Sequence, residues 1–297
     1  MTVTSAIVSD TALPPNGHIP ERAAAPAAST SPPSLFSLQG STVVVTGAGR
    51  GIGQAVAKGI VEAGGAVACI DLHPEPSNSE GEWDAIKQAA EKAGVSATYH
   101  VCDITDEEAL GETFKQIEQT SSGLLRAVLH GAAVQQMLSA VDYPIDDFRR
   151  IMEINVTGTF VTSKVTANFW KDRNIKGSLV LIASNSGVVA NRGVTSAAYN
   201  TSKAAVLQMC RSLAQEWGPA YGVRVNTLSP GFVRTAMTDR LLVEKPEIRD
   251  QFMSTALLGR LGTPEDLIGP AVFLLSEASA WMTGADLRFD GGQTATA

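Results

Sequence analysis

The chain has 297 residues, of which 44% are hydrophobic, and its 23 basic and 30 acidic residues give a formal net charge of −7. The hydrophobic content is ample for a large buried core, while the scattered basic residues argue against nucleic acid or an anionic membrane as a partner. No apolar run approaches the roughly 18 residues that a membrane-spanning helix needs. The cysteines lie far apart in apolar segments, so we expect buried thiols and neither disulfides nor a metal site; they are Cys69, Cys102 and Cys210.

Residues 1–35 differ from the rest of the chain in composition. The stretch "ALPPNGHIPERAAAPAASTSPPS" is rich in proline, alanine and serine and has no helical or strand periodicity, which is typical of a flexible leader. It has no charged start followed by an apolar stretch, and it is poor in arginine, so it matches neither a secretory signal nor a mitochondrial presequence. We therefore expect a cytoplasmic protein. An arm that packs between subunits is the alternative role for this leader.

Short β-branched runs alternate with helical patterns from residue 40 to the end of the chain. Strands are predicted at residues 41–47, 66–71, 96–105, 125–134, 177–184, 223–231 and 285–292, and helices at 53–65, 83–94, 106–119, 144–170 and around 197–205. This alternation predicts a parallel sheet with helices on both faces and right-handed crossovers. The fold class is therefore α/β, a Rossmann-type doubly wound parallel sheet of about seven strands, in a single domain over residues 36–297.

The first predicted strand runs directly into the glycine-rich stretch "TGAGRGIG", residues 46–53, and a helix follows. Glycine permits positive φ and lets the backbone approach a pyrophosphate, and the N-terminus of the next helix offers free N–H groups and the positive end of its dipole. A glycine-rich turn alone is a weak signal, but its place between the first strand and the first helix indicates a dinucleotide site. The spacing is T-G-x-x-x-G-x-G, with Gly47, Gly49, Gly51 and Gly53.

Two acidic residues follow the next two predicted strands. Asp71 ends the second strand, 24 residues after Gly47, where an acid accepts hydrogen bonds from the adenine ribose hydroxyls and repels a 2′-phosphate. Asp71 therefore favours NAD(H), the alternative being a strand-end acid that only meets solvent. Arg50 in the glycine-rich turn leaves NADP(H) open, because an arginine there can bind a phosphate. Asp103 is placed either to contact the adenine edge or to cap the helix that starts at residue 106.

Tyr199 and Lys203 in "AAYNTSKAA" lie four residues apart in a helical pattern, so their side chains share one face of the helix. Such a pair occurs on many solvated helices, and the spacing alone does not distinguish a catalytic pair from ordinary helix surface. The other motifs of the chain decide between these two interpretations.

Three motifs in this order, "TGAGRGIG", "YNTSK" and "SPGFVRT", resemble the short-chain dehydrogenase/reductase family in its single-domain form. The resemblance covers about residues 38–293, and the terminal "TGADLRFDGG" is similar to the family's last strand. The stretches "IASNSG", "AAYNTSKAA" and "TGADL" are most similar to fungal polyol dehydrogenases and ketose reductases, such as mannitol dehydrogenase and sorbose reductase. The resemblance implies an NAD(P)-dependent oxidoreductase that transfers hydride between nicotinamide and a secondary alcohol or ketone, in a homotetramer or homodimer.

The resemblance also implies four catalytic residues. Tyr199 would exchange a proton with the substrate oxygen, and Lys203 would lower the tyrosine pKa from its ordinary value near ~10 and hold the nicotinamide ribose. Ser184 would hydrogen-bond the substrate oxygen, and Asn155 in "EINVTG" would support a water-linked proton path to Lys203. Counting thirteen residues back from the tyrosine, the usual family spacing, reaches Ser186 instead, whereas alignment on "LVLIAS" favours Ser184.

Further residues are assigned to the cofactor by the same resemblance. Pro230 and Gly231 in "SPGFVRTAM" would shape the turn under the nicotinamide, and Thr235 would contact its carboxamide or the phosphates. The full set expected around the cofactor comprises Gly47, Arg50, Gly51, Ile52, Gly53, Asp71, Asp103, Ile104, Tyr199, Lys203, Pro230, Gly231, Val233 and Thr235.

A long segment, residues 232–260, follows the sixth predicted strand. We expect it to fold over the substrate as a lid, the alternative being a plain helical excursion. The loop 187–195, "GVVANRGVT", would line the opposite side of the substrate. The subgroup likeness favours a polyol or ketose as substrate, while the apolar lid favours a bulkier ketone as the alternative. The apolar lid residues are Leu241, Leu242, Phe252 and Met253.

The chain departs from the family at residues 130–133, which read His-Gly-Ala-Ala where the family usually has Asn-Asn-Ala-Gly. The small residues preserve the turn beside the cofactor, but the asparagine side-chain bonds that tie the central strand are lost. We expect His130 to be a structural strand residue rather than a catalyst. The departure lends weight to a non-catalytic, cofactor-binding scaffold, whereas the complete set of tyrosine, lysine, serine and asparagine favours an enzyme.

Overall fold

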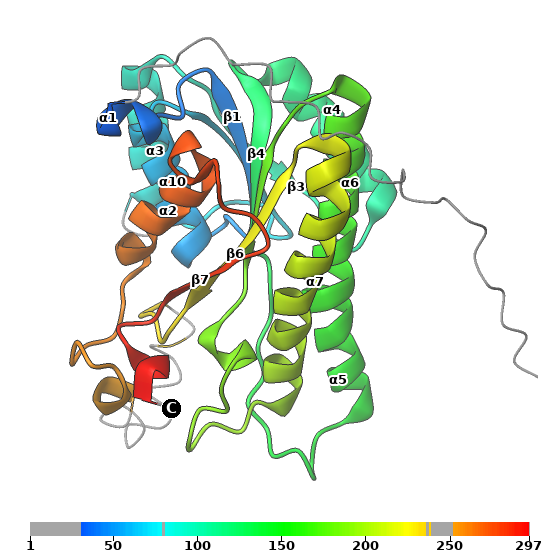
Figure 1. The fold of residues 1–297 in the computed structure, drawn as a ribbon, viewed down its shortest axis with the longest axis vertical. Coiled ribbons are helices and arrows are strands. Elements are labelled where there is room, and N and C mark those ends of the chain that lie inside the picture. Colours follow the sequence, from blue (N-terminus) through cyan, green and yellow to red (C-terminus); the bar gives the residue numbers. More distant parts are fainter. Residues whose placement is uncertain (1–30, 79–80, 236–237, 239–251, 297) are drawn as a thin grey trace, which may run out of the picture.

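The computed structural model describes residues 31–78, 81–235, 238 and 252–296 (Figure 1). Its centre is a seven-stranded sheet in the order β3-β2-β1-β4-β5-β6-β7 with every neighbouring pair parallel, which confirms the predicted doubly wound α/β fold. The strands are β1 (Ser41–Thr46), β2 (Ala66–Asp71), β3 (Ala97–Val101), β4 (Leu124–His130), β5 (Ser178–Ile182), β6 (Arg224–Pro230) and β7 (Asp286–Phe289).

Helices connect successive strands and cover both faces of the sheet. The α-helices are α1 (Pro32–Leu35), α2 (Gly51–Glu62), α3 (Glu82–Ala93), α4 (Glu107–Thr120), α5 (Ile145–Met152), α6 (Gly158–Arg173), α7 (Ala197–Tyr221) and α10 (Ile268–Leu275). Shorter helical turns are η1 (Glu153–Thr157), η2 (Asn185–Gly187), η3 (Pro264–Leu267), η4 (Glu277–Ser279) and η5 (Gln293–Thr296).

The hydrophobic core has two parts, one on each face of the sheet. Strand β1 is buried along its whole length, and its side chains alternate between the faces because successive strand residues point in opposite directions. Val44 lies in the core under α4, α6 and α7, whereas Val43 and Val45 lie in the core under α2, α3 and α10. Figure 1 shows these two groups of helices on opposite sides of the sheet. Burial on both faces explains why the strands read as continuous apolar runs.

The long helix predicted over residues 144–170 is interrupted. Helix α5 ends at Met152, the π-helical turn η1 spans Glu153–Thr157, and α6 begins at Gly158. A π turn adds one residue to a single turn and keeps helical backbone angles, so the sequence still reads as one helical segment.

Several predicted strands extend too far at their carboxyl ends. Strand β3 ends at Val101, β4 at His130 and β5 at Ile182, and the residues that follow leave the sheet in turns. The strand order reverses between β1 and β4, and in open parallel sheets ligands bind at such a reversal, beyond the carboxyl ends of the strands. The turns that the prediction assigned to strands therefore lie where a site is expected.

Parts of two predicted segments fall outside the described residues. Of the leader, residues 31–35 are described and include the four-residue helix α1, and of the lid 232–260, residues 232–235, 238 and 252–260 are described, so Leu241 and Leu242 lie outside. In the described part of the chain no helix is long and apolar enough to cross a membrane. No group of three or more His, Cys, Asp or Glu residues there could hold a metal ion, and the three cysteines are buried and free.

Candidate active site

The glycine-rich turn after β1 lies against the turn after β4. Gly47 has a φ of +70°, and a Cβ at this position would stand 2.6 Å from the Ala132 nitrogen, so any larger residue requires the backbone to move. The Gly47 N–H also donates to the Ile70 carbonyl in β2 (2.9 Å). The turn is thereby held by β2 and β4 at the reversal point of the sheet.

Helix α2 presents its N-terminus to this turn. It begins at Gly51, whose φ is +61°, and the Arg50 side chain before it does not cap the helix. Its first turn continues with Ile52, which contacts the core, and the buried Gly53. A Cβ on Gly51 would lie 3.7 Å from the Thr235 side chain, so the segment after β6 reaches the same place. A close backbone turn followed by an uncapped helix N-terminus fits the pyrophosphate of a nicotinamide dinucleotide.

Asp71 ends β2 and turns its carboxylate toward the glycine-rich turn. It accepts hydrogen bonds from the Gly49 N–H (2.9 Å) and from the backbone and Nδ1 nitrogens of His73 (3.0 and 2.8 Å). Burial raises the pKa of Asp71, but the hydrogen bonds from His73 and Gly49 and the charge of His73 outweigh it, so this pKa lies below its ordinary value. Asp71 is therefore ionised at neutral pH. His73 was not among the predicted site residues, and its place two residues after Asp71 is the one signal that pointed to it.

Asp103 and Ile104 follow β3. Asp103 is exposed and accepts hydrogen bonds from the Thr105 N–H and hydroxyl (2.9 and 2.8 Å). The residue that caps α4 is Asp106, whose carboxylate accepts from the Ala109 N–H (3.0 Å). The alternative in which Asp103 caps this helix is therefore wrong, and its carboxylate remains at the carboxyl edge of the sheet. Ile104 is buried beside it.

Tyr199 and Lys203 occupy the first two turns of α7. The Lys203 Nζ lies 5.7 Å from the centroid of the Tyr199 ring and donates to the Ile182 carbonyl at the end of β5 (2.7 Å). The Tyr199 hydroxyl is hydrogen-bonded to the Ser184 side chain. The structure thus brings the tyrosine and lysine of α7 together with the serine of the turn after β5.

The pKa values of this pair are shifted toward the uncharged forms. Burial raises the pKa of Tyr199 to about 12, although the Ser184 bond acts in the opposite direction. Burial also lowers the pKa of Lys203 to about 8. The prediction of a lowered tyrosine pKa is therefore wrong in this structure, because burial outweighs the Ser184 bond and the lysine donates to Ile182. At pH 7 the tyrosine is protonated and the lysine is mostly charged.

Asn155 lies in η1 and is buried. Its Oδ1 accepts from the Val134 N–H and its Nδ2 donates to the Val134 carbonyl, both at 2.9 Å. Nδ2 also donates to the Ser202 hydroxyl (3.0 Å), one residue before Lys203 on α7. One amide therefore ties the segment after β4 to the helix that carries the tyrosine and lysine, and π turns are frequent at functional sites.

His130 occupies the end of β4 and is buried. Its Nδ1 lies 2.9 Å from the Thr46 hydroxyl at the end of β1, and its Nε2 lies 3.0 Å from the Thr159 hydroxyl on α6. Because Thr159 donates its own proton to the Asn155 carbonyl (2.6 Å), His130 donates through Nε2 and accepts at Nδ1. Burial, and after it the charge of Lys203, lowers the pKa of His130 to about 3, so the ring is neutral. These bonds join β1, β4 and α6, which agrees with the structural role predicted for His130.

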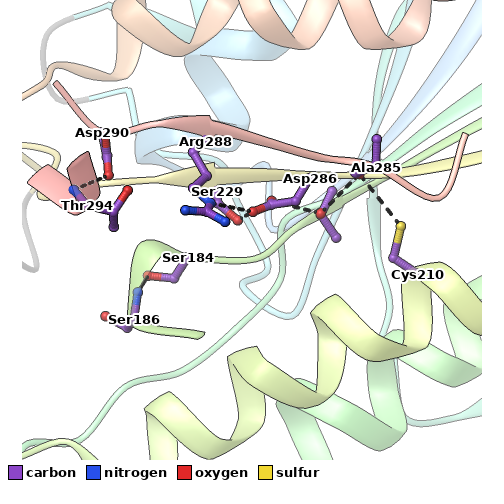
Figure 2. Close-up of polar contacts among 10 residues, drawn as sticks. Ser184, Ser186, Cys210, Ser229, Ala285, Asp286, Arg288, Asp290 and Thr294 are labelled. Atoms are coloured by element: carbon purple, nitrogen blue, oxygen red, sulfur yellow. Dashed lines mark hydrogen bonds and ion pairs between the residues drawn. The ribbon is translucent and has the colours of Figure 1, made fainter. Parts of the chain in front are cut away.

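The two candidate serines have different partners. The Ser184 hydroxyl is bonded to Tyr199 and accepts from the Ser186 N–H (3.1 Å). The Ser186 hydroxyl donates to Asn185 Oδ1 (3.4 Å) and accepts from Asn191 Nδ2 (2.8 Å). Ser184 is therefore the serine that faces the tyrosine, while amide groups engage Ser186; Figure 2 shows both serines on the turn after β5.

Pro230 and Gly231 turn the chain away from the sheet at the end of β6. A Cβ on Gly231 would stand 2.8 Å from the Asp290 Cα, so the chain passes close to the C-terminal segment. Val233 is buried and forms an isolated parallel bridge with Gly262. The predicted nicotinamide turn is therefore held between β7 and the segment that follows the lid.

A cavity of about 110 Å³ adjoins this turn. Phe232 and Phe252 form part of its wall, and their rings stack with centroids 3.7 Å apart and planes 4° apart. Phe252 is buried and Met253 is half-buried. The described end of the lid thus supplies an apolar surface beside the site.

Comparison with known proteins identifies the family. A sequence family described as enoyl-(acyl carrier protein) reductase matches residues 47–294. A protein of Aspergillus versicolor named short chain dehydrogenases/reductase notP' is 40% identical over 284 residues, which cover 93% of this chain and 96% of the relative. The chain belongs to the short-chain dehydrogenase/reductase family, and it is an NAD(P)-dependent oxidoreductase.

Two further relatives within this family are reductases of ketones. A sorbose reductase of Candida albicans is 32% identical over 261 residues, which cover 88% of this chain and 89% of the relative. The crystal structure of an NADPH-dependent 3-quinuclidinone reductase from Rhodotorula rubra is 32% identical with a TM-score of 0.81, covering 92% of this chain and 98% of that one. The predicted likeness to ketose reductases is confirmed.

Proposed function

We propose that this oxidoreductase interconverts a secondary alcohol and a ketone, with Tyr199 giving a proton to the substrate oxygen in reduction and taking it back in oxidation. The observation that carries the proposal is the meeting of Tyr199, Ser184 and Lys203 at the carboxyl end of β5. When bound, the nicotinamide cofactor supplies or accepts the hydride. Because burial keeps Tyr199 protonated at neutral pH, it holds the proton that reduction requires.

The other three residues support the tyrosine. An oxygen placed beside the Tyr199–Ser184 pair accepts a hydrogen bond from each hydroxyl, which orients the substrate and stabilises negative charge on that oxygen. We assign Lys203 the stabilisation of the phenolate that forms when Tyr199 gives up its proton, although in the resting geometry its ammonium donates to the Ile182 carbonyl. Asn155 holds α7 through Ser202, and we assign it the support of a water-linked proton path to Lys203.

Asp71 favours NAD(H) as the cofactor. Its carboxylate is ionised and faces the glycine-rich turn, so a 2′-phosphate placed there would meet a like charge. The dinucleotide would be held by Gly47 and Gly51 at its phosphates, by Asp71 at its adenine ribose and by Lys203 at its nicotinamide ribose. One structural relative is NADPH-dependent, so the preference has to be measured. Tighter binding of NADPH than of NADH by the wild-type protein would overturn this assignment.

A polyol or ketose is the first candidate substrate. The likeness to a sorbose reductase supports it, and so do the amide and hydroxyl groups beside Ser184. A bulkier ketone is the second candidate, because stacked Phe232 and Phe252 present an apolar wall next to the nicotinamide turn. The structural likeness to a reductase of 3-quinuclidinone supports this alternative.

A substrate panel combined with one variant tests the proposed chemistry. Ketoses, polyols, 3-quinuclidinone and aromatic ketones would be assayed with NADH, NADPH and their oxidised forms. Tyr199→Phe should lower kcat about 1000-fold for any substrate that is found, since it removes the proton donor, and should leave the Kd for NADH within about threefold. Full activity in the variant would sink the mechanism. Tight NADH binding without turnover of any compound would favour the non-catalytic scaffold.

Assembly and location complete the proposal. We propose a homotetramer or homodimer, supported by the exposed aromatic side chains of Phe148 on α5, Phe160 on α6 and the fully exposed Trp281. Light scattering measures this directly. A cytoplasmic location is supported by the three free thiols.

A further inference from the structure

A closed ring of hydrogen bonds joins the turn after β5, the loop 187–195 and the C-terminal segment. Gln293 Nε2 donates to Asn191 Oδ1, and Asn191 Nδ2 donates to the Ser186 hydroxyl, both at 2.8 Å. The Ser186 hydroxyl donates to Asn185 Oδ1 (3.4 Å), and Asn185 Nδ2 donates back to Gln293 Oε1 (2.7 Å). Each of the four side chains therefore donates to the next and accepts from the previous one.

The bonds of the ring all run in one direction, and Gln293 closes it. An amide has a donor end and an acceptor end, so turning one amide over would place donor against donor and acceptor against acceptor. Asn185 is 1% and Gln293 is 7% exposed, so a lost bond here is not replaced freely by water and costs more than it would at the surface. Gln293 therefore links the two asparagines, since it accepts from Asn185 Nδ2 and donates to Asn191 Oδ1.

The ring touches the serine that faces Tyr199. Asn185 Oδ1, which accepts from Ser186, also accepts from the Ser184 hydroxyl at 3.3 Å. The Ser186 N–H donates to the Ser184 hydroxyl from the other side (3.1 Å). The orientation of the Asn185 amide thus decides whether the Ser184 proton meets an acceptor or a donor.

The C-terminal segment holds Gln293 in place. The Asp290 carboxylate accepts from the Gly292 N–H (3.0 Å) and the Thr294 N–H (2.9 Å), which fixes the turn on both sides of Gln293. Figure 2 shows the contact between Asp290 and Thr294 after the end of β7, with Ser184 and Ser186 on the neighbouring turn. Gln293 is 102 residues from Asn191 and 108 from Asn185 in sequence, so the ring ties the C-terminal segment to the turn after β5 and the loop that follows it.

We propose that Gln293 is a positioning residue that sets substrate affinity and selectivity by holding the loop 187–195 and orienting the amide beside Ser184. Its side-chain hydrogen bonds go to Asn185 and Asn191 and not to Tyr199 or Lys203. The inference rests on the proposed function of Tyr199 and Ser184. In this proposal the C-terminal turn that carries Gln293 contributes to substrate binding.

Hydrogen exchange of the free protein tests the ring without any substrate. In Gln293→Ala, backbone amides of residues 185–195 should exchange at least about tenfold faster, since two hydrogen bonds of the ring are lost. Gln293→Glu keeps an acceptor for Asn185 but loses the donor to Asn191, so an intermediate increase is expected. Thr294→Ala is the matched control, because Thr294 enters the turn through its backbone N–H; it should exchange as wild type does. Thermal unfolding checks that all three variants fold.

Kinetics then separate positioning from a merely structural role. With sorbose and NADH, Gln293→Ala should raise the KM for sorbose about tenfold and leave the Kd for NADH unchanged, whereas simple loss of folded enzyme lowers kcat and leaves KM alone. Asn191→Ala should raise KM similarly, and the double variant should be no worse than either single variant, because both break one ring.

Wild-type exchange of residues 185–195 in Gln293→Ala would overturn the proposal, as would equal changes in the Thr294→Ala control. Faster exchange with an unchanged KM would also overturn it, since the loop would then be held by Gln293 without consequence for the substrate. If the wild-type protein reduces no ketone while the exchange changes as expected, the proposed function fails and the coupling of the three segments stands.

Discussion

The two halves of the sheet build their parts of the site by different means. Around β1, β2 and β4 the backbone forms the site. Gly47 and Gly51 adopt positive φ, and the N-terminus of α2 is not capped by the Arg50 side chain. Around β5, β6 and β7 side chains form it, through Tyr199 and Ser184 and the amide ring closed by Gln293. One half depends on glycine at a few positions, and the other on polar side chains from distant segments.

The two halves therefore differ in how much their side chains can change without loss of binding. A phosphate cradle made from N–H groups serves the same dinucleotide whatever side chains surround it. An amide ring instead changes shape and hydrogen-bonding direction with each substitution, so it can discriminate between substrates. Substitutions in each half of the sheet test this difference.

The two serines of the substrate half should differ most in effect. Ser184→Ala should lower kcat about 100-fold, because it removes a donor to the substrate oxygen. Ser186→Ala, the matched change two residues away, should lower kcat less than about fivefold and act mainly on KM, since it breaks the ring. Steady-state kinetics with the best substrate of the panel measure both. A reversed order would make Ser186 the catalytic serine.

In the cofactor half, a single methyl group should be enough to damage the site. Gly47→Ala should weaken NADH binding about 30-fold, because the new Cβ would meet the Ala132 nitrogen at 2.6 Å and the residue has a φ of +70°. Gly111→Ala in α4 is the control, as nothing lies within 4 Å of its Cβ position, and it should bind NADH normally. Fluorescence titration measures the Kd. Unchanged binding in Gly47→Ala would show that the turn does not hold the dinucleotide.

The pH profile probes the lysine of the substrate half. Because burial lowers the pKa of Lys203 to about 8 and Tyr199 stays protonated up to about 12, reduction should be nearly constant below pH 7 and fall about tenfold between pH 7 and pH 9 as the ammonium loses its proton. NADH binding at both pH values should be measured separately. Lys203→Arg keeps its charge and should lose this fall, whatever its absolute rate. A flat profile up to pH 9.5 in the wild type would contradict the role of the ammonium.

His130 ends β4, the strand of the cofactor half that pairs with β5, and should affect activity least. His130→Leu leaves the Thr46 and Thr159 hydroxyls without their ring partner, so it should lower the free energy of unfolding by about 2–3 kcal/mol, while kcat of the folded enzyme changes less than about threefold. His130→Asn, the residue usual in the family, should cost less. Denaturant unfolding and kinetics on the same samples provide the comparison. A large loss of kcat at unchanged stability would make His130 part of the chemistry.

Local patterns in the sequence determined the sheet, its helices and the cofactor half. Apolar runs and helical periodicity reflect burial within each element, so the sequence alone predicts the strands and helices. The stretch "TGAGRGIG" can be recognised in the same way, because its glycines meet local backbone requirements. The pairing of Tyr199 with Lys203 is legible for the same reason, since one helical turn separates them.

Tertiary structure alone decided the rest. The π turn at Asn155 keeps the segment helical, and the bonds that Asn155 makes to Val134 and Ser202 appear only in the folded chain. The raised pKa of Tyr199 depends on burial that no local pattern records. The contact of Ser184 with Tyr199, which supports the serine that strand alignment favours, joins two different elements. The role of Gln293 depends on its bonds to Asn191 and Asn185, which lie 102 and 108 residues before it. Such contacts exist only once the chain has folded, because the bonds join residues that are neighbours in space and not in sequence.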